Sequence, residues 1–207
     1  MTERPERPRQ QARFDEKRAG VVTAASRVFA VRGYDQTSVP DLADALGMAV
    51  GSLYHYFEGK EQLLIAICDQ LMEPLLERAL ALDGEGVERL YALVVMWIAH
   101  VAEHRDHMLV FQQERHLIER GEQWRGVRAS RKAFERLVDD VLAEVEAAGV
   151  LARVDRRLAL VALLGMVNHT PQWFRPRGPL QVNDIAGGYV RLLLAGPHET
   201  KLRPWET

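Results

Sequence analysis

Histidine is the residue type whose spacing first suggests chemistry in this sequence. His100, His104 and His107 stand at positions i, i+4 and i+7, which share one face of an α-helix. Imidazole nitrogens presented together in this way are common zinc ligands. However, the residues from Glu103 to Asp106 have the pattern of a helix boundary, and histidines on an exposed face are often only solvated. We therefore predict no metal site, and metal binding by these histidines stays as an alternative.

Other residue types that commonly carry catalysis lack a suitable setting. Cys68 is the only cysteine, and its place in the apolar run LLIAICDQL indicates a packed thiol. The sequence has no glycine-rich phosphate loop and no nucleophile motif. Its carboxylates are scattered among arginines, as on ordinary helix surfaces. We therefore predict no catalytic residues, no cofactor and no enzymatic activity.

Length and charge limit the classes of protein that this chain can form. It has 207 residues, of which 47% are hydrophobic, so it can bury a substantial core. The formal net charge of -2 argues against coating nucleic acid or membranes by bulk charge. The N-terminal stretch is charged, and no later segment has the roughly 20 apolar residues of a membrane span. These features, with the single cysteine, predict a cytoplasmic protein without a membrane partner.

Apolar residues recur at helical spacing through most of the sequence, which predicts an all-α fold of about nine helices. Residues 1–13 alternate Arg, Glu and Pro, so we expect a flexible basic arm there, and a tail at 199–207. Pro171 lies inside one helical pattern and should kink or end that helix. The expected helices lie at about 15–32, 39–46, 50–57, 60–82, 86–103, 105–119, 124–148, 156–174 and 183–195.

Two of the expected helices, 39–46 and 50–57, are short and are joined by a turn that begins at Gly47. This pattern is typical of a DNA-binding helix-turn-helix, although the same pattern also occurs as a packing corner in helical proteins. The charge is unusual for a DNA-binding segment, because Lys60 is the only Lys or Arg in residues 33–77. Positive charge for DNA would then have to come from elsewhere, and the arm at the N-terminus is one source.

The order of residues in VFAVRGYDQTSVPDLADALGMAVGSLYHYFEGKEQLL closely resembles the N-terminal domain of TetR/AcrR-type transcriptional repressors. The matching features are RGY before the second helix, the T-S-V-x-x-L-A start, the A-x-x-x-G-x-x-x-G-S-L-Y-x-Y-F stretch and K-x-x-L-L. The resemblance implies a homodimer that binds a palindromic double-stranded DNA operator. It also implies a DNA-binding domain at 14–60, and a ligand-binding and dimerisation domain at 61–198 that pairs through its last two long helices.

Carried over position by position, the resemblance assigns the DNA contacts mostly to small, polar and aromatic residues. Many members have a small hydroxyl residue followed by Lys or Arg where this chain has Ala49 and Val50. We therefore expect Val50 to contact a thymine methyl group, which identifies a base without charge. The assigned positions are Thr37, Ser38 and Lys60 near phosphates, Ala49, Val50, Gly51 and Ser52 at the bases, and Tyr54, His55 and Tyr56 at the backbone.

The stretch LLGMVNHTPQWFRPRGPLQVNDIAGGYVRLLLAG is similar to a TetR-type subgroup that answers acyl-coenzyme A thioesters, and EHRD and FQQERHL also resemble it. Such a ligand needs cations for its phosphates and an apolar cavity for its acyl chain. The candidate ligand-binding residues are Trp97, Phe111, Arg115, Arg128, Asn168, Trp173, Arg175 and Arg177.

Alternatives to this ligand assignment stay open at the level of the sequence. The same aromatic residues could be core or interface residues, and the same arginines could be solvated or salt-bridged. His169 and Pro171 replace residues that are often aromatic in the subgroup, so the acyl preference is undefined. The chain could be a repressor that answers a different hydrophobic ligand, or a helical metal- or lipid-binding protein without a role on DNA.

Overall fold

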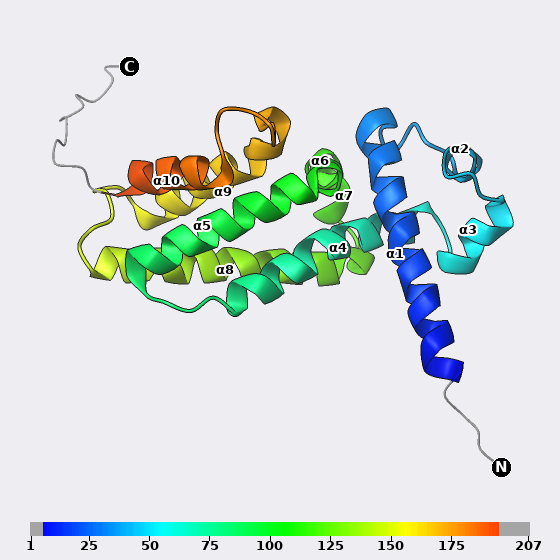
Figure 1. Ribbon diagram of the computed structural model, residues 1–207, viewed down its shortest axis with the longest axis horizontal. Helices are drawn as coiled ribbons and strands as arrows, with labels where there is room; N and C mark the ends of the chain where they lie inside the picture. The colour runs from blue at the N-terminus through cyan, green and yellow to red at the C-terminus, as the bar shows by residue number, and fades with distance from the viewer. Residues whose placement is uncertain (1–5, 195–207) are drawn as a thin grey trace, which may run out of the picture. The chain divides into compact units, whose positions relative to one another are not determined.

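The computed structural model describes residues 6–194, over which the chain forms ten α-helices and one 3-10 helix (Figure 1). This confirms the all-α prediction, since the isolated bridge between Leu151 and Leu194 is the one β feature in that range. None of the described helices is long and apolar enough to cross a membrane. The helices are α1 Glu6–Arg32, α2 Val39–Ala45, α3 Val50–Tyr56, α4 Lys60–Leu80, α5 Gly86–Glu103, α6 Arg105–Gln113, α7 Arg115–Ile118, η1 Glu122–Trp124, α8 Arg125–Ala147, α9 Arg156–Trp173 and α10 Val182–Leu193.

The first helix is longer than predicted, because α1 begins at Glu6 and not near Asp15. The prediction of a flexible arm is therefore wrong for residues 6–13, while residues 1–5 lie outside the described residues, as does the tail at 199–207. Pro8 does not prevent the helix, since it stands in the first turn, where no intrahelical donor is needed. The Arg, Gln and Ala residues that follow Pro8 favour a helix.

Two further boundaries show where local pattern and structure differ. The helix expected at 105–119 is divided at Glu114, which ends α6 and begins α7 with a non-helical backbone (φ -96°, ψ 17°). In α9, Pro171 is buried inside the helix, which ends two residues later at Trp173. Pro171 removes one helical hydrogen bond to an earlier residue, and Pro176, three residues after Trp173, disfavours a helical backbone in the residue before it.

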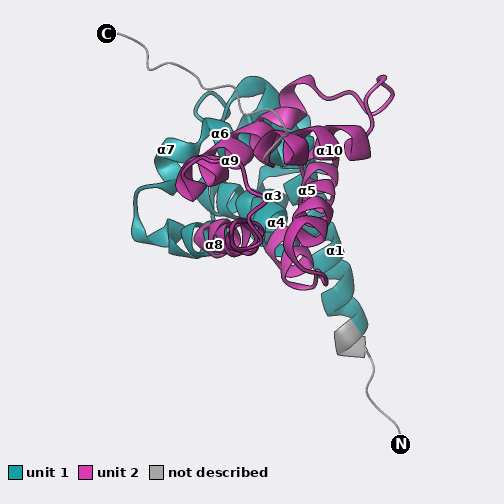
Figure 2. Cartoon of the chain, turned by 90° about the vertical axis from the view of Figure 1, so that its left-hand side faces the viewer, with its two compact units in different colours: residues 1–74, 104–131 teal, residues 75–103, 132–207 magenta. Residues whose placement is uncertain are grey.

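The chain divides into two compact units, one formed by residues 1–74 and 104–131 and the other by residues 75–103 and 132–207 (Figure 2). The first unit therefore includes α6 and α7 together with the first three helices. Within this unit, α1 packs along α6 and α2 packs against α3. In the second unit, α5 packs against both α9 and α10, which also contact each other.

The three histidines do not share an exposed helical face, because the chain breaks at His104 between α5 and α6. His100 is buried in α5, and its Nδ1 lies 3.5 Å from Nη1 of Arg78. His107 is buried in α6, with Nε2 2.9 Å from Oε1 of Gln70. Across residues 6–194, no three His, Cys, Asp or Glu side chains are grouped so that they could hold a metal ion.

Candidate nucleic-acid interface

The second helix begins with a reciprocal cap. Ser38 accepts a hydrogen bond from the backbone N–H of Asp41 at 3.2 Å, and its own N–H donates to the Asp41 carboxylate at 3.0 Å. The Ser38 hydroxyl also donates to that carboxylate, and these bonds lower the pKa of Asp41. Ser38 is exposed as predicted for a residue near a phosphate, but its hydroxyl is engaged in starting α2.

Thr37 is placed differently from the prediction. Its side chain is only 1% exposed, and its hydroxyl donates to the carbonyl oxygen of Gly33 at 2.7 Å. Its backbone N–H is also used, since it donates to the carbonyl of Tyr34 at 3.2 Å. Thr37 therefore stabilises the turn between α1 and α2 and does not present a donor to a phosphate.

The third helix has one buried edge and one open edge. Leu53 and Phe57 are buried, whereas Ala49, Gly51, Ser52 and His55 are exposed. Val50 and Tyr54 are exposed to 37% and 52%, which is high for apolar and aromatic side chains. Apart from its two chain neighbours and the backbone of its own helix, no atom lies within 4 Å of the position that a Cβ would take at Gly51. The open edge thus carries two kinds of residue. Its small residues let the helix backbone approach a partner closely, and its apolar groups could contact the edges of bases.

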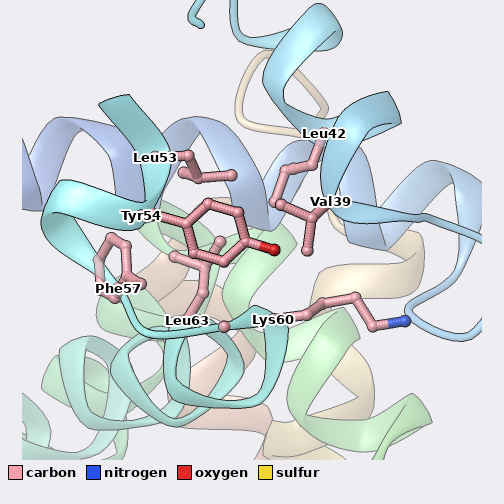
Figure 3. Close-up of a pocket in the computed structure, with 8 residues that line it drawn as sticks. Val39, Leu42, Leu53, Tyr54, Phe57, Lys60 and Leu63 are labelled. Carbon is pink, nitrogen blue, oxygen red and sulfur yellow. The ribbon is translucent and has the colours of Figure 1, made fainter. Parts of the chain in front are cut away.

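A small apolar pocket lies behind the open edge, where α2, α3 and the start of α4 meet (Figure 3). Its lining includes Val39 and Leu42 from α2, Leu53 and Tyr54 from α3, and Leu63 from α4. Because Tyr54 lines this pocket and is also half exposed, its ring both positions α3 and stays open to a partner. This packing fixes which edge of α3 faces outward.

Two residues that the sequence analysis did not select hold the end of α3. The ring of Phe14 in α1 lies 5.5 Å from the ring of His55 and 5.1 Å from the ring of Tyr56, between centroids. The guanidinium of Arg18 lies 4.8 Å above the centre of the Phe57 ring. Phe14 is the one aromatic residue in a charged segment. This isolation is the feature of the sequence that could have identified it as a packing residue.

Lys60 also has a structural role that the sequence analysis did not include. Its ammonium donates to the carbonyl of Tyr34 at 2.8 Å and lies 4.1 Å from the centre of the Tyr34 ring. Burial is the main reason why the pKa of Tyr34 rises to about 12. The buried carboxylate of Glu114 accepts a hydrogen bond from the Tyr34 backbone, and burial raises the pKa of Glu114. Lys60 thus fixes the α1–α2 turn and retains further N–H donors for a phosphate.

The candidate ligand residues of the first unit serve mainly in packing and turns. Phe111 is buried in α6. Arg128 donates to the carbonyl oxygens of Ile118 and Gly121, at 3.0 and 2.8 Å, and so holds the turn before α8. Arg115 is exposed and lies 3.5 Å from the carboxylate of Glu119 in the next turn. Each of these three residues therefore has a packing or turn-stabilising role within its unit.

The candidate ligand residues of the second unit separate into a buried one and a group at the end of α9. Trp97 is 1% exposed and packs edge-on against Phe134, with 4.8 Å between ring centroids. Trp173 is 40% exposed, and Arg175 and Arg177 in the following turn are also exposed. Asn168 lies on the same helix as Trp173 and is half-buried. Because the eight candidates are divided between two units, neither unit assembles them into one site.

Comparison with known proteins defines the family. Residues 83–197 match the family described as tetracyclin repressor-like, C-terminal domain, and residues 21–67 match bacterial regulatory proteins of the tetR family. The chain belongs to the tetR family. It is 28% identical over 199 residues to the HTH-type transcriptional repressor KstR2 of Mycolicibacterium smegmatis, covering 93% of this chain and 94% of the relative.

Two other relatives bear on the subgroup. The fatty acid metabolism regulator protein of Bacillus subtilis is 24% identical over 184 residues, covering 86% of this chain and 94% of the relative. AibR, solved in complex with isovaleryl coenzyme A and operator DNA, has a TM-score of 0.73 and 29% identity, covering 85% of this chain and 97% of AibR. The predicted membership of the family and the predicted likeness to its acyl-coenzyme A subgroup are therefore confirmed.

Proposed function

We propose that this tetR-family regulator is a homodimeric repressor that binds a palindromic operator through α3 and is released by a coenzyme A thioester. The open edge of α3 carries the proposal, because Val50, Gly51 and Ser52 are exposed there while Leu53 on the other edge is buried. A helix presented in this way can enter a major groove and contact base edges. The tetR-family match over residues 21–67 covers the same helices.

An exposed apolar face on the last two helices supports the proposed homodimer. Leu158 and Val161 on α9 and Leu192 on α10 are large, apolar and well exposed. Ala162 and Gly165 are exposed and follow Leu158 and Val161 by four residues, so they lie on the same face of α9; such small residues allow a second helix to approach closely. Apolar side chains gathered on one surface are typical of an interface. A homodimer would supply two α3 helices, one for each half-site of a palindromic operator.

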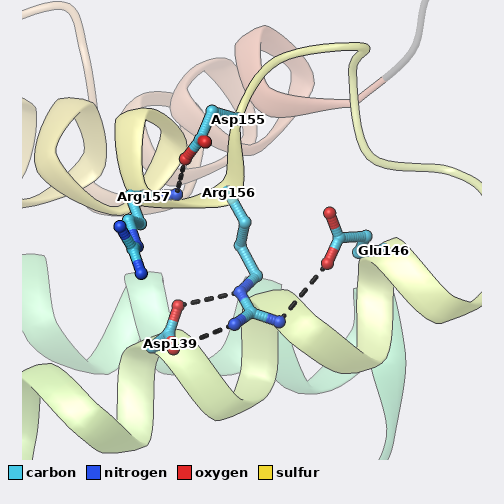
Figure 4. Close-up of polar contacts among 5 residues, drawn as sticks. All are labelled: Asp139, Glu146, Asp155, Arg156 and Arg157. Carbon is cyan, nitrogen blue, oxygen red and sulfur yellow. Dashed lines mark hydrogen bonds and ion pairs between the residues drawn. The ribbon is translucent and has the colours of Figure 1, made fainter.

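The helix that carries this face is firmly attached at its start (Figure 4). The Asp155 carboxylate accepts from the Arg157 N–H at 2.7 Å and so caps α9. Arg156 lies between two carboxylates of α8, 3.0 Å from Asp139 and 3.3 Å from Glu146. The reversal from α8 to α9 is thereby fixed, as a helix in a dimer interface requires.

The exposed end of α9 supports a coenzyme A thioester as the inducer. Trp173 offers an aromatic face for an adenine ring, and Arg175 and Arg177 offer guanidinium groups for phosphates. AibR, a relative of the same fold, has been solved with isovaleryl coenzyme A. The inducer would act by favouring a conformation in which the two α3 helices no longer match the spacing of the half-sites.

A mobility-shift titration on the DNA that flanks the gene for this protein tests the proposal. We expect a specific complex that acyl-coenzyme A dissociates, whereas coenzyme A alone and the free fatty acid do not. If free fatty acid also dissociates the complex, the inducer is a hydrophobic ligand that need not be a thioester. If acyl-coenzyme A, coenzyme A and free fatty acid all leave the complex intact, coenzyme A thioesters are not the inducers. Absence of any specific complex would contradict the repressor and favour a binding protein without a role on DNA.

Replacing Val50 with alanine should weaken discrimination at one base pair of each half-site. The expected loss is about 1 kcal/mol, because an exposed apolar contact of two methyl groups is removed. The measurement compares wild type and V50A on a set of operators that each carry one base substitution. Val31→Ala is a control, since Val31 is an exposed valine at the end of α1. An unchanged base preference in V50A would show that Val50 does not contact a base.

A further inference from the structure

The helix-turn-helix of this chain has a charge that opposes DNA binding. Residues 33–59 contain four carboxylates, Asp35, Asp41, Asp44 and Glu58, and no Lys or Arg. Lys60 follows directly, but its one positive charge does not balance the four carboxylates. The Debye length is about 10 Å at 0.1 M salt, so carboxylates this close to a phosphate backbone repel it. A neighbouring element must therefore supply the positive charge.

The first turns of α1 are such an element. Every residue from 9 to 20 is exposed except Phe14, which is half-buried, and the first buried residue of the helix is Val21. In Figure 1 the dark blue end of α1 extends beyond α3. This segment is therefore helical without being part of the core, and only one of its apolar side chains is anchored.

The anchor holds these turns beside the recognition helix. Phe14 contacts the rings of His55 and Tyr56, at centroid distances of 5.5 and 5.1 Å. Both contacted residues lie at the end of α3, where contacts to the DNA backbone are proposed. A DNA backbone that contacts this end of α3 would therefore also lie close to the first turns of α1.

The anchor also sets which side of α1 carries charge. Arg9, Arg13 and Lys17 are spaced four residues apart, so they form one row along the helix, about 6 Å apart in axial rise. All three are exposed. Asp15 lies on the other side of Phe14, where Gln11 donates to its carboxylate at 2.9 Å, while Glu16, three residues after Arg13, borders the row on the side away from Phe14. The row is therefore a strip of three cations that is bordered by one carboxylate.

We propose that Arg9, Arg13 and Lys17 form a second DNA contact, in which the extended first helix binds the phosphates that flank the bases read by α3. This inference rests on the proposed operator binding. Guanidinium and ammonium groups pair with phosphate oxygens whatever the base sequence, so the strip supplies affinity and α3 supplies sequence preference. Arg18 is not in the strip, because its guanidinium lies over Phe57.

The test is the salt dependence of operator binding by the full chain, measured for wild type and for the variant R9Q/R13Q/K17Q. Each lost phosphate contact lowers the slope of log K against log salt by about 0.9. A dimer of the variant would lose six contacts, three in each subunit, so the slope should fall by about 5 units. Affinities for operator and for unrelated duplex should fall by similar factors. The ratio between them, which reports base reading, should stay within about twofold of wild type, since the removed contacts are to phosphates.

A matched control removes the same number of charges elsewhere. K132Q/R136Q/R157Q replaces three exposed cations of the second unit and should leave the slope at the wild-type value. Far-UV circular dichroism and melting show whether the first variant remains folded. If it does not, the single variants R9Q, R13Q and K17Q replace it, each with an expected loss of about two units, one for each subunit of the dimer. An unchanged slope, or an equal loss in the control, would overturn the inference. If wild type itself binds no operator, the proposed function fails first, which separates the two results.

Discussion

Replacing Gly51 with alanine is expected to stabilise the protein and to weaken operator binding by about tenfold or more. The stabilisation, up to about 1 kcal/mol, follows because alanine favours a helix over glycine. Nothing within 4 Å of the built Cβ position opposes the new methyl group. The loss of DNA affinity follows because that methyl group would stand between the backbone of α3 and the bases. Function and stability should therefore change in opposite directions.

The chain offers a matched control for this substitution. Gly126 is the second residue of α8, as Gly51 is the second residue of α3. Both are exposed, and neither has a neighbour within 4 Å of its Cβ position. Gly126→Ala should give a similar rise in melting temperature with unchanged operator affinity. If G51A binds operator as tightly as wild type in a mobility-shift titration, the backbone of α3 does not approach the bases closely.

Replacing Trp97 with alanine is expected to lower the free energy of unfolding by about 3 to 5 kcal/mol, the usual cost of removing a large buried aromatic side chain. Trp97 is 1% exposed and packs against Phe134, so the cavity would lie in the core of the second unit. Urea unfolding followed by circular dichroism measures the loss. A loss below about 1 kcal/mol would contradict the assignment of Trp97 to the core.

Trp173 provides the comparison for Trp97, since both were candidate ligand residues of the same type. Trp173 is 40% exposed, so Trp173→Ala should cost less than about 1 kcal/mol. If it stacks on the inducer, the acyl-coenzyme A concentration that releases the operator should rise in W173A, at least several-fold. An unchanged concentration would remove Trp173 from the inducer site, and a loss of operator binding without inducer would place it in the dimer interface.

Several elements of the fold were predictable because their causes are local. The bounds of α5, Gly86–Glu103, agree with the prediction, and Gly33 and Gly47 follow directly after α1 and close after α2 with positive φ angles. The spacing of Leu53 and Phe57 correctly predicts the buried edge of α3. Helical periodicity, caps and glycine conformations depend on residues within about one turn, so a single sequence contains them.

The start of α1 and the break at Glu114 were not predictable in the same way. Arg and Pro near the N-terminus are compatible with disorder or with a helix, and the contact of Phe14 with α3 joins residues 41 and 42 positions apart. Glu114 accepts a hydrogen bond from Tyr34, which is 80 positions earlier. The sequence around one residue of such a pair does not indicate the other residue. Each contact nevertheless helps to determine the backbone at the start of α1 or at the break between α6 and α7.

By itself, the sequence determined the helical class, most helix positions and, through the order of residues from 28 to 64, the family. Only the tertiary structure decided the direction of individual side chains, with Thr37 turned inward to Gly33, Lys60 bound to Tyr34, and Trp97 buried while Trp173 is exposed. The physical reason is range. Helix formation follows from hydrogen bonds four residues apart, whereas burial depends on packing against elements that the chain brings together from far along its length.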